Sequence, residues 1–225
     1  DKQGTNLISK NTVKDRWPHN NWGDLWVQIR PEVTDKFKKK VHPANEISFN
    51  TMGWTAHNDP NFDMISDGYS ITPGVWNHLV VCHDDGNIQT MYLNGRKVAQ
   101  VAFTKSSRRD ESRDTRIQIY QPADIFIGGG GVYKSGFNGV IDEVQIWNKP
   151  LTEDEVKQAM KGFKEDNIPA NLMGYFTFET KEGDNIFPNL GKGGAENKAH
   201  LVVMANSGGE DTSKAFYKEE SADNS

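Results

Sequence analysis

Apolar and polar residues alternate over short stretches along most of the chain, and Gly, Asn and Asp interrupt them about every ten residues. Successive side chains of a strand point to opposite faces, so this alternation predicts strands with one buried face, joined by turns. The stretches that fit are 6–10, 25–30, 46–51, 78–83, 88–93, 97–103, 125–127, 140–147, 172–178 and 200–204.

One helix is well marked. Thr152 is a suitable N-cap, Glu155 follows three residues later as in a capping box, and Gly162 is a suitable stop. The apolar stripe of this helix consists of Val156, Ala159 and Met160. Many strands with a single short helix favour an all-β fold, an antiparallel two-sheet β-sandwich, over a parallel α/β sheet.

Three motifs follow one another in a recognisable order: a strand region containing Trp76, the hairpin Tyr92-Leu93-Asn94-Gly95, and the strand-to-helix exit at 139–151. Asn94-Gly95 supplies the two positive-φ residues that a type I′ turn needs. Together the motifs resemble the laminin-G-like branch of the concanavalin A-like lectin/glucanase jelly rolls, over roughly residues 6–152. The resemblance implies that Trp76 and Trp147 occupy core positions.

The chain departs from this family pattern at both ends. One or two strands usually precede the equivalent of residues 7–10, and they are missing here, whereas 172–179 resembles a strand that commonly opens such a unit. Residues 172–204 either complete the sheet or begin a second, degenerate unit, and we favour completion. We therefore expect one sandwich domain over 1–204, followed by a polar tail over 205–225.

Composition narrows the class of protein. The 225 residues carry a formal net charge of −5, so nucleic acid is an unfavourable partner. Cys82 is the single cysteine, which excludes an internal disulfide, and its apolar neighbours predict a buried thiol. No stretch approaches the ~20 apolar residues of a membrane span. Because the chain begins with Asp1, we expect any targeting segment to have been removed or to lie upstream.

The acidic residues argue against catalysis. The β-glucanases of this resemblance use carboxylates that project from one strand, and these must be spaced by two or four to share a face. Asp142 and Glu143 are adjacent, and the pattern Glu-x-Asp-x-Glu is absent. The sequence therefore predicts that the chain is not an enzyme, although carboxylates from separate strands could still converge.

Asp142 has two interpretations. Alternation places it with Val140, Val144 and Ile146 on one face of a strand, which we expect to be the buried one. An inward carboxylate must be hydrogen-bonded or paired. The alternative is a calcium ligand, since the resemblance implies calcium at the rim of the sandwich.

The segment 54–69 combines aromatic rings with amides and carboxylates, a mixture suited to sugars. We expect this segment to be a loop whose ligand-binding residues are Trp54, His57, Asn58, Asp59 and Tyr69. Asp59 and Asp63 are candidate calcium ligands together with Asp142. The alternative is a loop of turn-forming Asn and Asp whose aromatic side chains cover the edge of the core.

A second aromatic cluster at 17–26 adds Trp22 in a loop and Trp26 on a strand, where it could face the concave surface. Packing into the protein is the alternative for both.

These patterns lead to one functional hypothesis. The chain is predicted to be a non-catalytic, extracellular carbohydrate-binding module of a larger surface or secreted bacterial protein, with calcium as a candidate cofactor. The alternatives are a structural or protein-adhesion module and, third, a glycoside hydrolase of the same fold.

Overall fold

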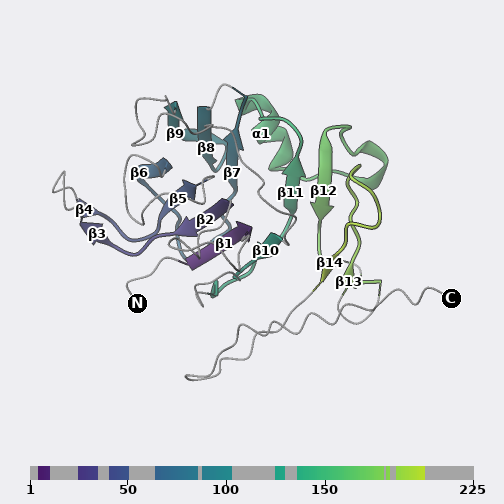
Figure 1. Cartoon of the computed structure of the whole chain (residues 1–225), viewed down its shortest axis with the longest axis horizontal. Coiled ribbons are helices and arrows are strands. Elements are labelled where there is room, and N and C mark those ends of the chain that lie inside the picture. The colour runs from purple at the N-terminus through teal and green to yellow at the C-terminus, as the bar shows by residue number, and fades with distance from the viewer. Residues whose placement is uncertain are drawn as a thin grey trace, which may run out of the picture. The chain divides into compact units, whose positions relative to one another are not determined.

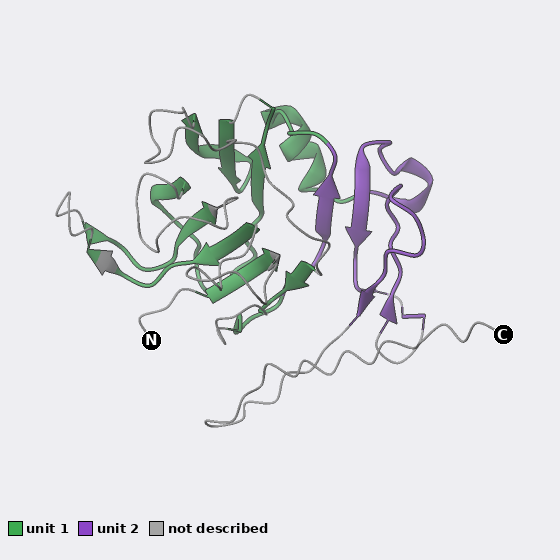
Figure 2. Cartoon of the chain, viewed as in Figure 1, with its two compact units in different colours: residues 1–140, 149–162 green, residues 141–148, 163–225 purple. Residues whose placement is uncertain are grey.

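The structure of the protein is a computed structural model that describes residues 5–10, 25–34, 41–50, 64–85, 88–102, 125–129, 136–179, 181–182 and 186–200. The chain divides into two compact units (Figure 2). Unit 1 comprises Asp1–Val140 and Lys149–Gly162, and unit 2 comprises Ile141–Asn148 and Phe163–Ser225.

The first sheet of unit 1 has five antiparallel strands in the order β10-β1-β2-β5-β6 (Figure 1). Their bounds are Ile125–Ile127 (β10), Thr5–Lys10 (β1), Leu25–Ile29 (β2), Glu46–Asn50 (β5) and Met64–Ser70 (β6). A short hairpin of β3 (Val33–Thr34) and β4 (Val41–His42) lies between β2 and β5 in the sequence.

The second sheet of unit 1 has the order β7-β8-β9, with bounds Leu79–His83, Ile88–Leu93 and Arg96–Ala102. Asn94 and Gly95 join β8 to β9 with φ values of 52° and 77°. Two consecutive positive φ values are those of a type I′ turn, so the predicted hairpin is confirmed.

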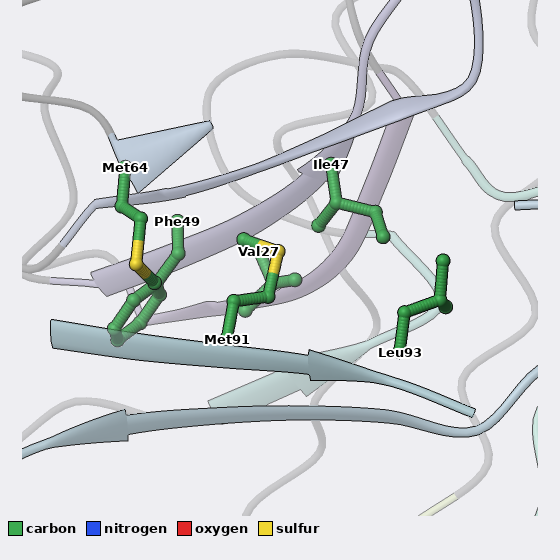
Figure 3. Close-up of a cluster of buried hydrophobic side chains, with 6 residues drawn as sticks. All are labelled: Val27, Ile47, Phe49, Met64, Met91 and Leu93. Carbon is green, nitrogen blue, oxygen red and sulfur yellow. The ribbon is translucent and has the colours of Figure 1, made fainter. Parts of the chain in front are cut away.

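The hydrophobic core lies between these two sheets. Six buried side chains cluster there: Val27, Ile47, Phe49 and Met64 from the first sheet, and Met91 and Leu93 from the second (Figure 3). Each buried side chain of this size contributes about 1.5–3 kcal/mol relative to an exposed one. An antiparallel two-sheet sandwich is thus confirmed as the fold.

Helix α1 (Glu153–Ala159) forms where it was predicted. The Thr152 hydroxyl accepts from the Glu155 N–H, and the Glu155 carboxylate accepts from the Thr152 N–H at 2.9 Å, which makes a capping box. The hydrogen bond from Lys149, and then that from the Thr152 N–H, lower the pKa of Glu155 to about 2. Val156 and Ala159 are buried, but Met160 is 45% exposed, so the buried stripe ends one residue early.

Unit 2 contains β11 (Val144–Trp147), β12 (Leu172–Phe176), β13 (Ile186–Phe187), β14 (Ala199–His200) and a 3-10 helix at Glu165–Asn167. β12 pairs antiparallel with β11, and β13 with β14. The expectation that 172–204 completes a single sandwich stays a prediction. The tail at 205–225 lies outside the described residues.

Two expectations about local structure are wrong. Residues 64–69 form most of β6 and are not a loop. The strand was not predicted because Ser66 faces inward but is polar, which hides the alternation of apolar and polar residues. The buried Ser66 hydroxyl accepts a hydrogen bond from the Ile47 N–H at 2.9 Å. The strand predicted at 140–147 begins only at Val144, because Glu143 has a φ of 54°. A left-handed residue interrupts the two-residue alternation, so Val140 is 73% exposed although Val144 is buried.

Candidate functional site

The five-stranded sheet has two buried faces of different character. Val27, Ile47 and Phe49 face the core, whereas the alternate residues on the other face of β2 and β5 are largely polar. Buried members of that face are Trp26, Arg30, Glu46 and Ser48, at 8%, 9%, 0% and 1% exposure. Polar groups buried this completely need hydrogen-bond partners, so the face is held by specific contacts rather than by general packing.

A bulge in β6 brings polar groups of this face together. Glu46 pairs with Ser70 and Ser48 with Ile65, so the four residues of the β6 bulge, Ser66–Tyr69, lie opposite Ile47 alone. Gly68 has a φ of 86°, a conformation that favours glycine. Its N–H donates to Glu46 Oε1 at 2.5 Å.

His42, Glu46 and Asp67 form a compact group around the bulge. His42 Nδ1 lies 2.9 Å from Glu46 Oε2. One ring nitrogen of His42 and one carboxylate oxygen from each acidic residue all lie within 4.8 Å of one another. His42 and Glu46 are buried and Asp67 is exposed, so the group opens to solvent on the side of Asp67. Its donor atoms are those of a metal-binding site.

Tyr69 is exposed near the end of β6 in unit 1. Its ring is 37% exposed. Arg96, at the start of β9, lies over that ring at 5.3 Å from the centroid and donates from Nη2 to the Tyr69 hydroxyl at 3.3 Å. A cation over an aromatic face is attractive, so Arg96 orients the ring at the surface.

Trp76 lies in the turn that follows β6, seven residues after Tyr69 in the sequence. Asn77 fixes the turn, since its Nδ2 donates to the carbonyls of Thr72 at 2.8 Å and Val75 at 2.9 Å. The His78 N–H donates to Asn94 Oδ1 at 2.8 Å, which joins the turn to the β8–β9 hairpin. Within this ordered turn Trp76 is 69% exposed.

The expectation that Trp76 occupies a core position is therefore wrong. Strand β7 begins only at Leu79, so Trp76 lies in the turn before the strand and is not subject to its alternation. Trp147, the second residue assigned to the core, is half-buried in β11.

The described part of the chain contains three of the predicted site residues. Tyr69 is exposed on β6, as ligand contact requires. Trp26 lies on the face opposite Val27 as expected, but it is buried rather than open. Asp142 is exposed in unit 2 and accepts the Glu143 N–H at 2.8 Å, so the inward orientation is wrong. The other candidates lie outside the described residues: Trp22, Trp54, His57, Asn58, Asp59 and Asp63.

Four residues of the candidate site were not predicted: His42, Glu46, Arg96 and Trp76. The only signal for the first two was a four-residue spacing across the turn at Ala44 and Asn45, which has no established meaning outside a helix. The β6 bulge is what brings Asp67 close to His42 and Glu46. Sequence spacing does not report contacts between strands that are this far apart in the chain.

Comparison with known proteins identifies the family. Residues 16–157 match a laminin G family model described as the concanavalin A-like lectin/glucanases superfamily. The match covers most of the chain, and the chain belongs to this family. No protein in a search of the curated proteins matches it significantly.

Two solved structures are similar to the chain. One, from Bacteroides ovatus ATCC 8483, is described as "a putative carbohydrate binding protein"; it has a TM-score of 0.51 and 18% identity, over 83% of this chain and 44% of that chain. The chain thus spans less than half the length of that protein. The other is an S-layer domain-containing protein from Clostridium thermocellum ATCC 27405, with a TM-score of 0.28 and 18% identity over 70% of this chain and 63% of that chain. At these identities the first likeness supports the fold, and the second carries no argument.

The described residues contain no helix that is both long enough and apolar enough to cross a membrane.

Proposed function

We propose that the protein is a non-catalytic carbohydrate-binding module. The observation that carries the proposal is the exposure of two aromatic side chains, Tyr69 and Trp76, on a sandwich of the lectin and glucanase family. The likeness to the Bacteroides ovatus structure, described as "a putative carbohydrate binding protein", supports it.

Tyr69 and the polar side chains near it have the chemical groups that sugar binding requires. The C–H face of a pyranose packs on an aromatic ring, and the polar groups beside the ring take up its hydroxyls. At Tyr69 the guanidinium of Arg96 supplies donors, and Asp67, two residues away, supplies an exposed acceptor. Such contacts are individually weak, so we expect modest affinity for a single sugar and higher avidity for a polymer.

The burial of Glu46 argues against glycoside hydrolysis at this site. Hydrolysis requires two carboxylates that both reach the sugar. Glu46 and Asp67 lie close enough together, but Glu46 is 0% exposed. Its oxygens already contact His42 and accept the Gly68 N–H, so it is placed to organise the β6 bulge rather than to act on a substrate.

The wider context belongs to the same proposal. A module of this kind acts on glycans outside the cell, so we propose that it is part of a larger secreted or surface-attached bacterial protein. Calcium remains part of the hypothesis, with Asp59 and Asp63 of unit 1 and, separately, the exposed Asp142 of unit 2 as candidate ligands.

A glycan array tests the proposal. We expect wild-type protein to bind a defined group of glycans, and Trp76→Ala and Tyr69→Ala to reduce that binding at least tenfold. Val140→Ala is the matched control, because it also truncates an exposed apolar side chain of unit 1, and it should bind normally. Trp54→Ala tests the loop predicted from the sequence. Repeating the array with calcium and with a chelator tests the cofactor.

The same experiment contains the outcome that would overturn the proposal. A blank array from protein with normal circular dichroism would exclude simple glycan recognition and favour a protein-adhesion role. Binding that survives both Trp76→Ala and Tyr69→Ala would place the glycan elsewhere.

A further inference from the structure

We propose that His42, Glu46 and Asp67 bind a divalent transition-metal ion, with Zn²⁺ as the preferred cation. This inference goes beyond glycan recognition and does not depend on it. It rests on three ligand atoms from two strands and a bulge that lie within 4.8 Å of one another.

The fold holds two of the three ligands before any metal arrives. Glu46 is fully buried, and the Gly68 N–H fixes its Oε1. His42, at 7% exposure, lies 2.9 Å from its Oε2. Both side chains have therefore lost most of their rotamer freedom on folding. Zn²⁺ bound at Nδ1 would replace the proton shared by His42 Nδ1 and Glu46 Oε2, which would pass to solvent, and the exposed Asp67 would move toward the ion.

The donor set decides which metal is expected. Calcium and magnesium take oxygen ligands, and calcium requires six to eight of them. One imidazole nitrogen with two carboxylates matches zinc, which binds His nitrogen and Asp or Glu oxygen at about 2.0–2.2 Å. Tetrahedral ligands at that distance lie about 3.4 Å apart, so a small movement of Asp67 would complete the site.

The local charge also favours a cation. Glu46 and Asp67 bring two carboxylates together at an opening to solvent, and like charges this close repel each other. The strand register places Arg30 across from Glu46 on the same face, since the Arg30 N–H donates to the Glu46 carbonyl at 2.8 Å. Arg30 Nη1 is buried without a hydrogen-bond partner, so this atom closes no ion pair with Glu46.

Three protein ligands leave at least one coordination position for water or another small ligand, as in zinc sites that react or exchange ligands. That position would be on the side of Asp67, because the other two ligands are buried. Tyr69 is two residues further along β6.

Isothermal titration of the untagged, chelator-treated full chain with ZnCl₂, MnCl₂ and CaCl₂ tests the inference without any glycan. We expect one Zn²⁺ per chain, bound at least tenfold more tightly than Ca²⁺. Asp67→Asn should weaken Zn²⁺ binding at least tenfold, because an amide oxygen is a poorer ligand than a carboxylate. Asp67 is exposed, so this variant should fold normally.

Asp154→Asn is the matched control, since it removes a carboxylate whose side chain is 97% exposed, in helix α1 of unit 1, and it should leave Zn²⁺ affinity unchanged. His42→Gln supplies a second test if its circular dichroism is normal. The proposal is overturned if Zn²⁺ does not bind, if Asp67→Asn binds it as wild type does, or if an equal concentration of Ca²⁺ displaces the bound Zn²⁺. A failed titration together with a positive glycan array would remove the metal and leave the lectin role intact.

Discussion

Two exposed aromatic residues of unit 1 contrast with the packed aromatic residues of unit 2. In unit 2 they pack on one another: Trp147 meets Phe163 edge-to-face at 5.8 Å, and Phe163 meets Tyr175 at 6.1 Å. In unit 1, Tyr69 and Trp76 face solvent. Within unit 1, Trp26 and Phe49 on paired strands are buried, whereas Tyr69 near the end of β6 and Trp76 in a turn are exposed. Residue type alone does not distinguish the two uses.

Two glutamates repeat the contrast. Glu143 of unit 2 accepts a hydrogen bond from the Tyr175 hydroxyl at 2.5 Å. Tyr175 is a neutral donor and only 1% exposed, so this contact stabilises the unit. Glu46 of unit 1 lies against an imidazole and near a second carboxylate. That combination of groups is suited to a cation, and the same residue type therefore has a structural position in one unit and a candidate binding position in the other.

The largest expected difference between the units comes from the same substitution made in both. Tyr175→Ala should lower the free energy of unfolding by about 3–5 kcal/mol, because it removes a buried ring and leaves Glu143 without that donor. Tyr69→Ala should cost about 1 kcal/mol, the worth of an exposed cation–π contact. Urea denaturation followed by circular dichroism measures both. Equal losses would contradict the division of roles.

Alkaline pH should weaken unit 2 through the same tyrosine. Burial, and then the hydrogen bond to Glu143, raise the pKa of Tyr175 to about 12. The unfolded chain loses this proton near pH 10 and the folded chain only near pH 12, so stability is complete below pH 10 and falls as the pH rises between these values. The loss should reach about 2–3 kcal/mol.

Tyr175→Phe is the control for this pH dependence, because it keeps the ring and removes the titrating group. Urea midpoints between pH 9 and pH 12 should fall less steeply in this variant. Burial also raises the pKa of Tyr92 and of Cys82 in unit 1, so some dependence should persist. An unchanged slope would remove Tyr175 from the explanation.

A smaller effect is expected at the helix of unit 1. Thr152→Ala removes the capping box of α1 and should cost about 1 kcal/mol. Thr152→Ser keeps a hydroxyl at the N-cap and should restore nearly all of it. Thermal melts of the two variants measure the difference, and similar melting temperatures would show that the cap hydroxyl contributes little.

The smallest change in stability is expected at Trp76. Trp76→Ala should alter the free energy of unfolding by less than about 0.5 kcal/mol, since the side chain is 69% exposed. A glycan-binding loss in a variant of normal stability would identify Trp76 as a contact residue. A large loss of stability would instead indicate that it packs within the protein.

Local features of the sequence predicted much of the fold. The β8–β9 hairpin follows from Asn94-Gly95, and α1 from Thr152 and Glu155, because a turn or a cap depends on residues within four positions of each other. Strand β6 was missed because Ser66 is polar and inward-facing. The inward position of Asp142 was wrong because Glu143 adopts a positive φ, which no neighbouring glycine or proline indicates.

The candidate site was harder to predict for a related reason. Tyr69 was expected to bind a ligand from a loop; it is exposed but lies on strand β6, and its role as a ligand contact stays a prediction. His42, Glu46 and Asp67 carry no motif, and they meet because Glu46 is buried opposite the β6 bulge. A bulge is a property of two paired strands, so neither strand contains it alone.

The amino-acid sequence alone determined the all-β class, the family resemblance, the hairpin and the capped helix, since each depends on alternation or on contacts between near neighbours. Only the tertiary structure decided which aromatic rings face solvent and which titratable groups meet. Those outcomes depend on strand register and on residues of unusual φ, where a shift of one position turns every side chain to the other face.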